Sequence, residues 1–204
     1  MDSGQTALTA WSYGLAGAAY TALALHLWRT GHGRRAGQGA GRWMLAAVVV
    51  TAMWAWFGLA DLFASTVFFM RLGAVADLLA YAFWFMFLLR LLRPDSDARS
   101  GAAVAWLGSA AGLTIVIAAA LQLMVIVNGQ GVDERSRPVL LISMVLPVLA
   151  LVLVEQLLRN VQDDALWNAK PLCLGLAGGF LFDLYLFSTA VLFNGLDADV
   201  LSIR

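Results

Sequence analysis

Four ionisable side chains within or beside long apolar runs are the residues of this sequence best suited to chemistry. Asp183 lies near the middle of the last apolar run, which begins at Pro171. Asp61 and Asp77 lie near the facing ends of two earlier runs, and Arg71 lies between those runs. An ionisable group at membrane depth is costly, so each needs a partner or a water-filled site. These four residues are therefore the candidates for an intramembrane ligand or signal site.

A structural role competes with this interpretation. The connection between the second and third spans is short, so Asp61, Asp77 and Arg71 could form a ligand or proton site open to the outside, or an ion pair that joins the two helices. The pattern favours the ion pair. For Asp183 the functional and structural interpretations are evenly balanced. A lone buried carboxyl group can stay neutral and bond to Tyr185, Ser188 or a backbone group of a neighbouring helix.

Aromatic side chains deep in the apolar runs form a second candidate site. Trp54, Tyr81 and Trp84 could line a pocket for an apolar ligand. Core packing is the commoner role of such residues, and the pattern favours it. Both interpretations are kept.

A polar stretch between the last two apolar runs is predicted to form a helix hairpin on the cytoplasmic side. Its polar residues are Glu155, Gln156, Arg159 and Lys170. Glu155 precedes Arg159 by four residues, which is the favourable order for an ion pair on a helix surface. Pro171 suits the first turn of the following helix. A well-built hairpin without chemistry of its own is the favoured interpretation.

Composition identifies the class of protein. The 204 residues are 61% hydrophobic and 13% charged, and their mean hydropathy is +0.79. A soluble domain would be about one quarter charged. The chain is therefore expected to be an integral membrane protein whose partner is the lipid bilayer. Its zero net charge offers no basic field for nucleic acid. One cysteine and two histidines without matching carboxylate spacing disfavour a metal or haem site, so no cofactor is expected.

Six transmembrane helices are predicted, and together they form one domain over residues 1–204 without a soluble part. They cover approximately residues 8–28, 43–64, 72–92, 102–127, 138–158 and 171–193. Continuous apolar runs of about 20 residues are typical of spanning helices and unlike the alternating strands of a β-barrel. Small residues four apart, such as Gly108 with Gly112 and Gly175 with Gly179, predict close helix contacts.

The distribution of basic residues predicts the orientation. The loops after the first, third and fifth spans hold nine Lys and Arg residues, against four on the other side. Cytoplasmic loops are enriched in these residues, so the first group is placed inside. The N-terminus is then outside, and so is the C-terminus after an even number of spans. The first residues lack the basic region of a signal peptide, so the first span is expected to be retained.

Several segments carry a family resemblance. They are the opening AWSYGLAGAAYTALALHLWR, the segment TAMWAW and, above all, VEQLLRN, LWNAKPLCLGL and FDLYLFSTAVLF. These segments resemble the N-terminal transmembrane region of the PrsK family, the sensor histidine kinases of the PEP-CTERM/exosortase (XrtA) system. The resemblance covers essentially the whole chain and is tightest over residues 154–193. Elsewhere it is mainly a shared hydropathy profile.

The resemblance implies a multi-pass protein of the bacterial inner membrane, associated with exopolysaccharide and exosortase gene clusters. Members of the family continue with further membrane helices, a GAF-like region and a kinase core, none of which these 204 residues contain. The chain is therefore expected to be a truncated form or a kinase-less relative, and not itself an enzyme. A response regulator would be a partner only through the absent kinase.

We therefore expect a membrane-embedded sensory or anchoring domain of a two-component signalling protein. A stimulus would shift the packing of the second, third and sixth spans around their carboxylates. One alternative is a small ion- or proton-coupled transporter or channel-like protein that uses Asp183. Another is a membrane enzyme or lipid-binding protein that uses the aromatic pocket. A homodimer is compatible with all three.

Overall fold

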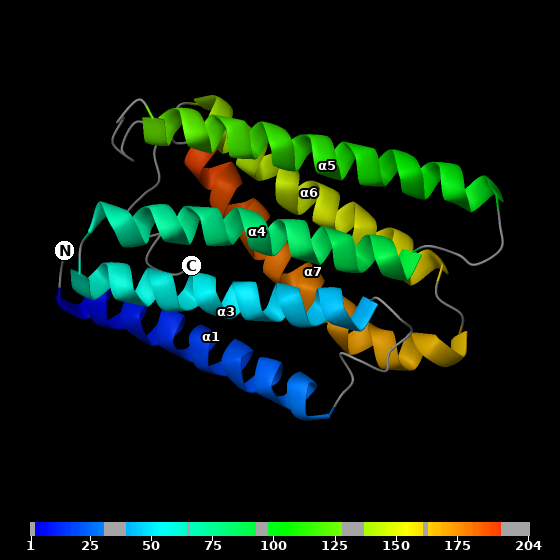
Figure 1. Cartoon of the computed structure of the whole chain (residues 1–204), viewed down its shortest axis with the longest axis horizontal. Helices are drawn as coiled ribbons and strands as arrows, with labels where there is room; N and C mark the ends of the chain where they lie inside the picture. Colours follow the sequence, from blue (N-terminus) through cyan, green and yellow to red (C-terminus); the bar gives the residue numbers. More distant parts are fainter. Residues whose placement is uncertain are drawn as a thin grey trace. The chain divides into compact units, whose positions relative to one another are not determined.

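The computed structural model describes residues 3–30, 40–64, 66–92, 98–127, 137–160 and 163–192. These residues form six helices, which confirms the predicted all-α fold (Figure 1). In chain order the helices are α1 (Ser3–Arg29), α3 (Ala40–Ala64), α4 (Val67–Leu92), α5 (Ala98–Val127), α6 (Arg137–Asn160) and α7 (Asp163–Leu192). Each predicted apolar segment lies within one helix, except that residue 193 is outside the described residues.

Five of the six helices, α3 to α7, are long and apolar enough by length and composition to cross a membrane. The chain is thus a multi-pass membrane protein. Helix α1 is not among the five, although its 27 residues would extend about 40 Å at 1.5 Å per residue. Its mean hydropathy is reduced by several Ser, Thr and Gly residues. The sixth span and the outside N-terminus stay predictions.

Packing divides the chain into two compact units. Unit 1 comprises residues Met1–Phe87 and Leu196–Arg204, and unit 2 comprises residues Leu88–Gly195. The boundary falls inside α4, so this helix belongs to both units. This division does not test the prediction of a single transmembrane domain.

In unit 1, α1 packs against α3 in the opposite direction, as Figure 1 shows for the blue and cyan helices. The ring of Tyr13 on α1 meets that of Trp54 on α3 edge-on, with 5.5 Å between their centroids. Helix α4 follows α3 after only two residues, which makes these helices antiparallel as well. Their side chains meet at Trp43 and Phe83, whose centroids are 5.9 Å apart.

In unit 2, α6 packs against both α7 and α5. Leu153, Pro147 and Cys173 are among the most deeply buried residues of the described chain. Pro147 has no N–H to donate within α6, yet the helix continues through it. The last turns of α4 approach α5, where the side chain of Leu89 lies beside Gly108.

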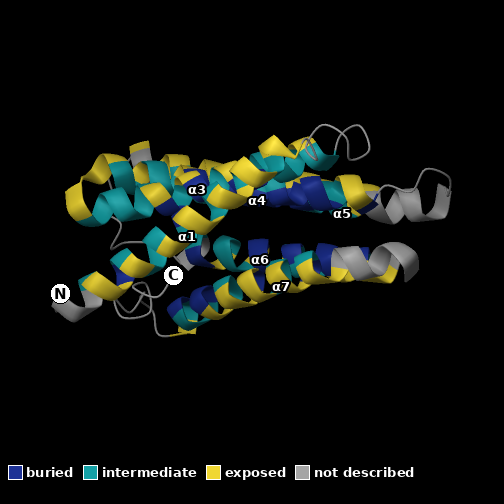
Figure 2. Cartoon of the chain, turned by 90° about the horizontal axis from the view of Figure 1, so that it is seen from below, coloured by how far each residue is buried: buried dark blue, intermediate teal, exposed yellow. Residues whose placement is uncertain are grey.

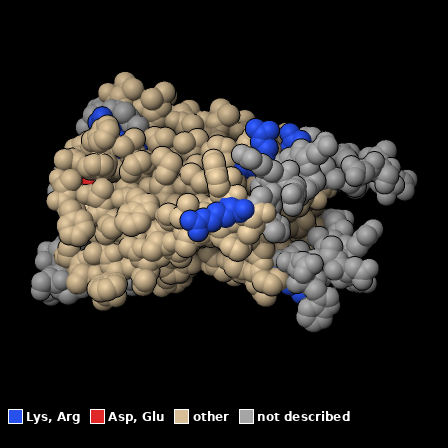
Figure 3. Space-filling model, turned by 60° about the horizontal axis from the view of Figure 1, so that its bottom comes forward, with Lys and Arg blue, Asp and Glu red and all other residues tan. Residues whose placement is uncertain are grey.

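Many large apolar side chains are exposed, as a lipid environment permits, although others such as Phe85 and Leu88 are buried. Small residues such as Ala47, Ala55 and Ala150 are completely buried, whereas large residues such as Leu174 and Val116 are exposed. Figure 2 shows buried and exposed positions on the same helices. Few charged side chains interrupt the face drawn in Figure 3. In a bilayer, small residues allow close helix approach, while large apolar side chains face lipid at no cost.

Among the glycines predicted to form close helix contacts, Gly108 lies beside a neighbouring helix, where an added Cβ would meet the side chain of Leu89 at 3.6 Å. An added Cβ at Gly175, Gly179 or Gly112 would meet nothing within 4 Å, so the prediction of close contacts there is wrong within this chain. The closer approaches are at Gly17 and Gly58, between α1 and α3. Spacing alone shows which glycines share a helix face, but not which face meets a neighbour.

Candidate functional site

Asp61 and Arg71 lie on either side of the short connection between α3 and α4. Asp61 is in the last turn of α3 and is half-buried, and Arg71 is the fifth residue of α4 and is exposed. The antiparallel register of the two helices places them at about the same level. Both residues are described, and no ion pair joins them. The favoured interpretation, an ion pair that joins the two helices, is therefore not seen between these two side chains.

Asp77 lies deeper in the same unit. It is six residues beyond Arg71 on α4, which corresponds to about 9 Å of helix rise and to a different face of the helix. It is half-buried and directly follows the buried Ala76. The predicted cluster is thus spread along α4 rather than gathered at one level. Its role as a ligand site stays a prediction.

The three aromatic residues of the predicted pocket pack against different neighbours. Tyr81 and Trp84 are buried on α4. Tyr81 meets Phe85 edge-on, with 6.1 Å between centroids. Trp54 turns toward α1, where it meets Tyr13. These contacts agree with core packing, the interpretation that the sequence favours, and a pocket for an apolar ligand stays a prediction.

Two indole–hydroxyl hydrogen bonds join the helices of unit 1. Trp84 Nε1 donates to Thr51 Oγ1 at 3.2 Å, which links α4 to α3. Trp56 Nε1 donates to Thr21 Oγ1 at 3.1 Å, which links α3 to α1. An indole N–H in hydrocarbon needs an acceptor, because no water is present to supply one.

Each of these threonines is itself held in place. The hydroxyl of Thr51 donates to the carbonyl of Ala47 at 2.8 Å, and that of Thr21 donates to the carbonyl of Gly17 at 2.6 Å. A threonine hydroxyl carries one hydrogen and two lone pairs, so it can donate along its own helix and accept across to the next. Sequence reasoning did not single out Thr21 or Thr51. A hydroxyl in the middle of an apolar run was the available signal.

Glycines admit the aromatic rings between α1 and α3. A Cβ added to Gly58 would lie 2.5 Å from the ring of Tyr13. A Cβ added to Gly17 would lie 3.1 Å from the indole of Trp56. The rings therefore occupy the space that side chains at these two positions would need. Gly17, Gly58 and the bond between Trp56 and Thr21 define the contact that orders α1 on α3.

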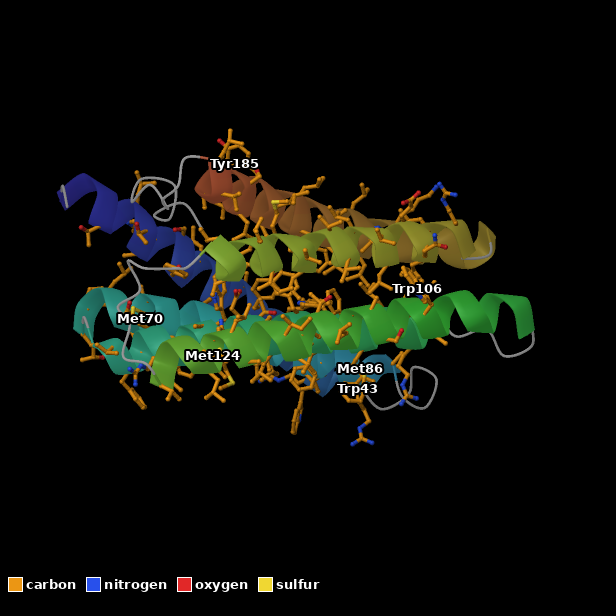
Figure 4. All side chains as sticks on the ribbon, turned by 90° about the horizontal axis from the view of Figure 1, so that it is seen from above. Trp43, Met70, Met86, Trp106, Met124 and Tyr185 are labelled. Atoms are coloured by element: carbon orange, nitrogen blue, oxygen red, sulfur yellow. The ribbon has the colours of Figure 1, made fainter. Side chains whose placement is uncertain are left out.

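Asp183 lies in unit 2, in the second half of α7, and is half-buried. The Ser188 hydroxyl, one partner suggested by the sequence, donates to the carbonyl of Tyr185 at 2.8 Å. Its oxygen keeps lone pairs that could accept a hydrogen bond from a neutral carboxyl group. Tyr185 is 59% exposed, and Figure 4 shows it projecting from the ribbon. The contribution of Asp183 to a site stays a prediction.

The hairpin region shows one predicted feature and one difference. Arg159 and Glu155 form the expected ion pair, with 2.6 Å between Nη2 and Oε1. Their side chains are 69% and 54% exposed, so the pair contributes little to stability. Helix α7 begins at Asp163 rather than near Pro171, which lies in the helix interior. The sequence prediction places the start of this segment at Pro171, where the apolar run begins. The helix itself begins earlier, because backbone hydrogen bonds do not require apolar side chains.

A metal centre finds no support in the described ranges, where no three His, Cys, Asp or Glu residues are grouped as metal ligands. No protein-family model, curated protein or solved structure matches this chain. The resemblance to the PrsK family therefore stays a prediction from the quoted segments.

Proposed function

We propose that this chain is a membrane-embedded sensory or anchoring domain of a bacterial two-component signalling protein. The observation that carries the proposal is the resemblance of residues 154–193 to the corresponding region of PrsK-family kinases. The all-helical structure supports a role confined to the membrane, because five described helices suit a bilayer. The bacterial inner membrane, a homodimer and a response regulator reached through a separate kinase region belong to the same proposal.

The proposal includes α1 as a sixth membrane span. Its polar and small residues recur every four positions at Thr9, Tyr13, Gly17 and Thr21. Thr9 is 4% exposed, and the other three contact aromatic residues of α3. These four positions are thus turned toward protein rather than lipid, whereas His26 and Arg29 near the end of α1 are exposed. Leu8, Trp11 and Leu15 are exposed and would face the bilayer.

In this mechanism α4 carries the signal, because it contributes to both compact units. A stimulus that changes packing in unit 1 would act on α4 through the bond between Trp84 and Thr51. The last turns of α4, with Leu89 against Gly108, would pass the change to unit 2. Two alternative packings of one element are what a switch requires.

A chimera tests the proposal. Residues 1–204 replace the matching N-terminal region of a PrsK-family kinase, and all later helices and the kinase core are kept. We expect the chimera to insert into the inner membrane and to support kinase autophosphorylation in membrane vesicles and expression of a response-regulator reporter. Autophosphorylation equal to that of a soluble kinase core without membrane helices would contradict the proposal.

Two comparisons sharpen this test. An unrelated six-helix membrane protein of similar length replaces the same region, and we expect a lower regulated output than with this chain. Liposomes containing the purified chain are assayed for proton and cation flux. A sensory or anchoring domain should show none, whereas flux that is lost in Asp183→Asn would favour a transporter instead.

A further inference from the structure

The ends of α1 and α3 that lie next to each other carry the same two residue types in mirrored order. Helix α1 ends in Trp28-Arg29, and α3 opens with Arg42-Trp43 after two residues. His26 precedes Arg29 by three residues and therefore lies on the same face of α1. Each of these two helix ends in unit 1 thus carries a tryptophan next to an arginine.

The register of the two helices brings these pairs to a common level. Tyr13 and Trp54 are in ring contact. Arg29 lies sixteen residues past Tyr13, and Arg42 lies twelve residues before Trp54. At 1.5 Å per residue the two arginines differ in height by about 6 Å, or roughly one helical turn. Both pairs therefore belong to one surface, which we call the Trp–Arg rim: His26, Trp28, Arg29, Arg42 and Trp43.

The cations of the Trp–Arg rim are exposed, and the described residues provide no acidic partner for its two arginines. His26, Arg29 and Arg42 are all exposed. In the part of the chain that the structure describes, neither arginine pairs with a carboxylate. The described aspartates of unit 1, Asp61 and Asp77, lie toward the opposite ends of their helices. The rim is therefore a basic surface without an acidic partner among these residues.

The aromatic members indicate that the anion belongs to a lipid. Trp28 is 70% exposed, and the neighbouring Leu25 is 54% exposed, so an apolar surface continues from the cations along α1. Trp43 is anchored from the other side by Phe83 of α4. Trp is favoured at the level of lipid headgroups, and the guanidinium group matches phosphate geometry.

We propose that the Trp–Arg rim binds the headgroup of an anionic phospholipid. Arg29 and Arg42 hold the phosphate, and the indoles of Trp28 and Trp43 lie at the level of the glycerol esters. A soluble phosphate ion would use the arginines but would leave the exposed apolar surface of Trp28 and Leu25 uncovered. This inference rests on the membrane embedding of α1 and α3 and not on any signalling role.

Spin-labelled lipids test the proposal. The purified chain is reconstituted in phosphatidylcholine vesicles with either spin-labelled phosphatidylglycerol or spin-labelled phosphatidylcholine, and the motionally restricted fraction is measured. We expect the protein to prefer phosphatidylglycerol. The double variant Arg29→Gln/Arg42→Gln should lower this preference by up to about thirtyfold, because each arginine contributes about fivefold to the attraction to an anionic surface. The matched control is Arg71→Gln, which removes a single exposed arginine near the start of α4, outside the Trp–Arg rim.

Four outcomes would overturn the proposal. In the variants, these are an unchanged preference for phosphatidylglycerol in the double variant and an equal loss of that preference in Arg71→Gln. In the wild type, they are a preference that is insensitive to added sodium chloride and a preference that inorganic phosphate abolishes at matched ionic strength. The last outcome would assign the arginines to a soluble anion. Circular dichroism establishes that each variant keeps its helices. If the kinase chimera fails while the lipid preference holds, only the signalling proposal is lost.

Discussion

At the scale of single residues, unit 1 is ordered by contacts between aromatic rings and very small neighbours. An added Cβ at Gly58 would clash with the ring of Tyr13 at 2.5 Å, and one at Gly17 would press tightly on the indole of Trp56 at 3.1 Å. Ring and glycine together exclude lipid from the contact and maximise van der Waals packing, the main attraction between helices in a bilayer. The identity of a residue at these positions matters more than its hydropathy.

Gly58→Ala is therefore expected to destabilise the protein. The added Cβ would lie within 2.8 Å of three ring atoms of Tyr13, which should cost about 1–3 kcal/mol as overpacking. This exceeds the gain of about 1 kcal/mol from the better helix propensity of alanine. The free energy of unfolding is measured by titration with sodium dodecyl sulfate, followed by circular dichroism.

Gly14→Ala is the matched control, because a Cβ at this position of α1 meets nothing within 4 Å. It should leave stability unchanged or raise it by up to about 1 kcal/mol. Equal stabilities for the two variants would contradict the close approach of α1 and α3 at Gly58.

At the scale of elements, the helices of unit 1 are tied by hydrogen bonds of one type. Trp84 on α4 reaches Thr51 on α3, and Trp56 on α3 reaches Thr21 on α1. Each bond satisfies an indole N–H that hydrocarbon could not satisfy. The bonds also select one rotation of each helix, because an indole reaches only one point on its neighbour.

A double-mutant cycle on Trp84 and Thr51 measures the tie between α3 and α4. Trp84→Phe removes the donor, and Thr51→Val removes the acceptor at nearly constant volume. We expect a coupling energy of about 0.6 kcal/mol and at most about 1.7 kcal/mol, the range for such bonds in membranes. Unfolding in detergent gives the four stabilities.

Trp106 supplies the control for the indole itself. It is 69% exposed, and Figure 4 labels it. Trp106→Phe combined with Thr51→Val should show no coupling, because the first residue lies on α5 and the second on α3. A coupling near zero for the Trp84 and Thr51 cycle as well would show that the indole bond does not order the two helices.

At the scale of the whole molecule, the number of membrane crossings depends on α1. Five helices meet the length and composition of a span, and α1 does not. The mean hydropathy of α1 is lowered in part by the buried Thr9 and by Thr21, whose hydroxyl accepts a hydrogen bond from Trp56 of α3. A helix whose polar groups are satisfied by a protein neighbour can cross a bilayer despite a modest mean hydropathy.

We expect the loop between α1 and α3 to lie in the cytoplasm and the N-terminus outside. Alkaline phosphatase, active only outside, and green fluorescent protein, fluorescent only inside, are each fused at the N-terminus, in this loop and at the C-terminus. Six crossings place the loop on the opposite side from both ends. The N-terminus and the loop on one side would show that α1 does not cross.

The all-helical class and the approximate position of each helix could be predicted from the sequence, because a membrane segment must be apolar over a bilayer-spanning length. The pair of Glu155 and Arg159 was predictable for a similar reason, since four residues bring side chains together on any helix. Both inferences depend only on neighbours along the chain.

The contacts between helices required the tertiary structure. In an apolar chain nearly every face of a helix is hydrophobic, so hydropathy does not show which face meets protein and which meets lipid. Gly175 and Gly179 have the spacing of a contact but face open space, whereas Gly58 fits the ring of Tyr13. Asp61 and Arg71 lie at one level without pairing, and Thr51 orders two helices through Trp84. Rotation about each helix axis decided these outcomes, and that rotation is set by side chains far apart in the chain.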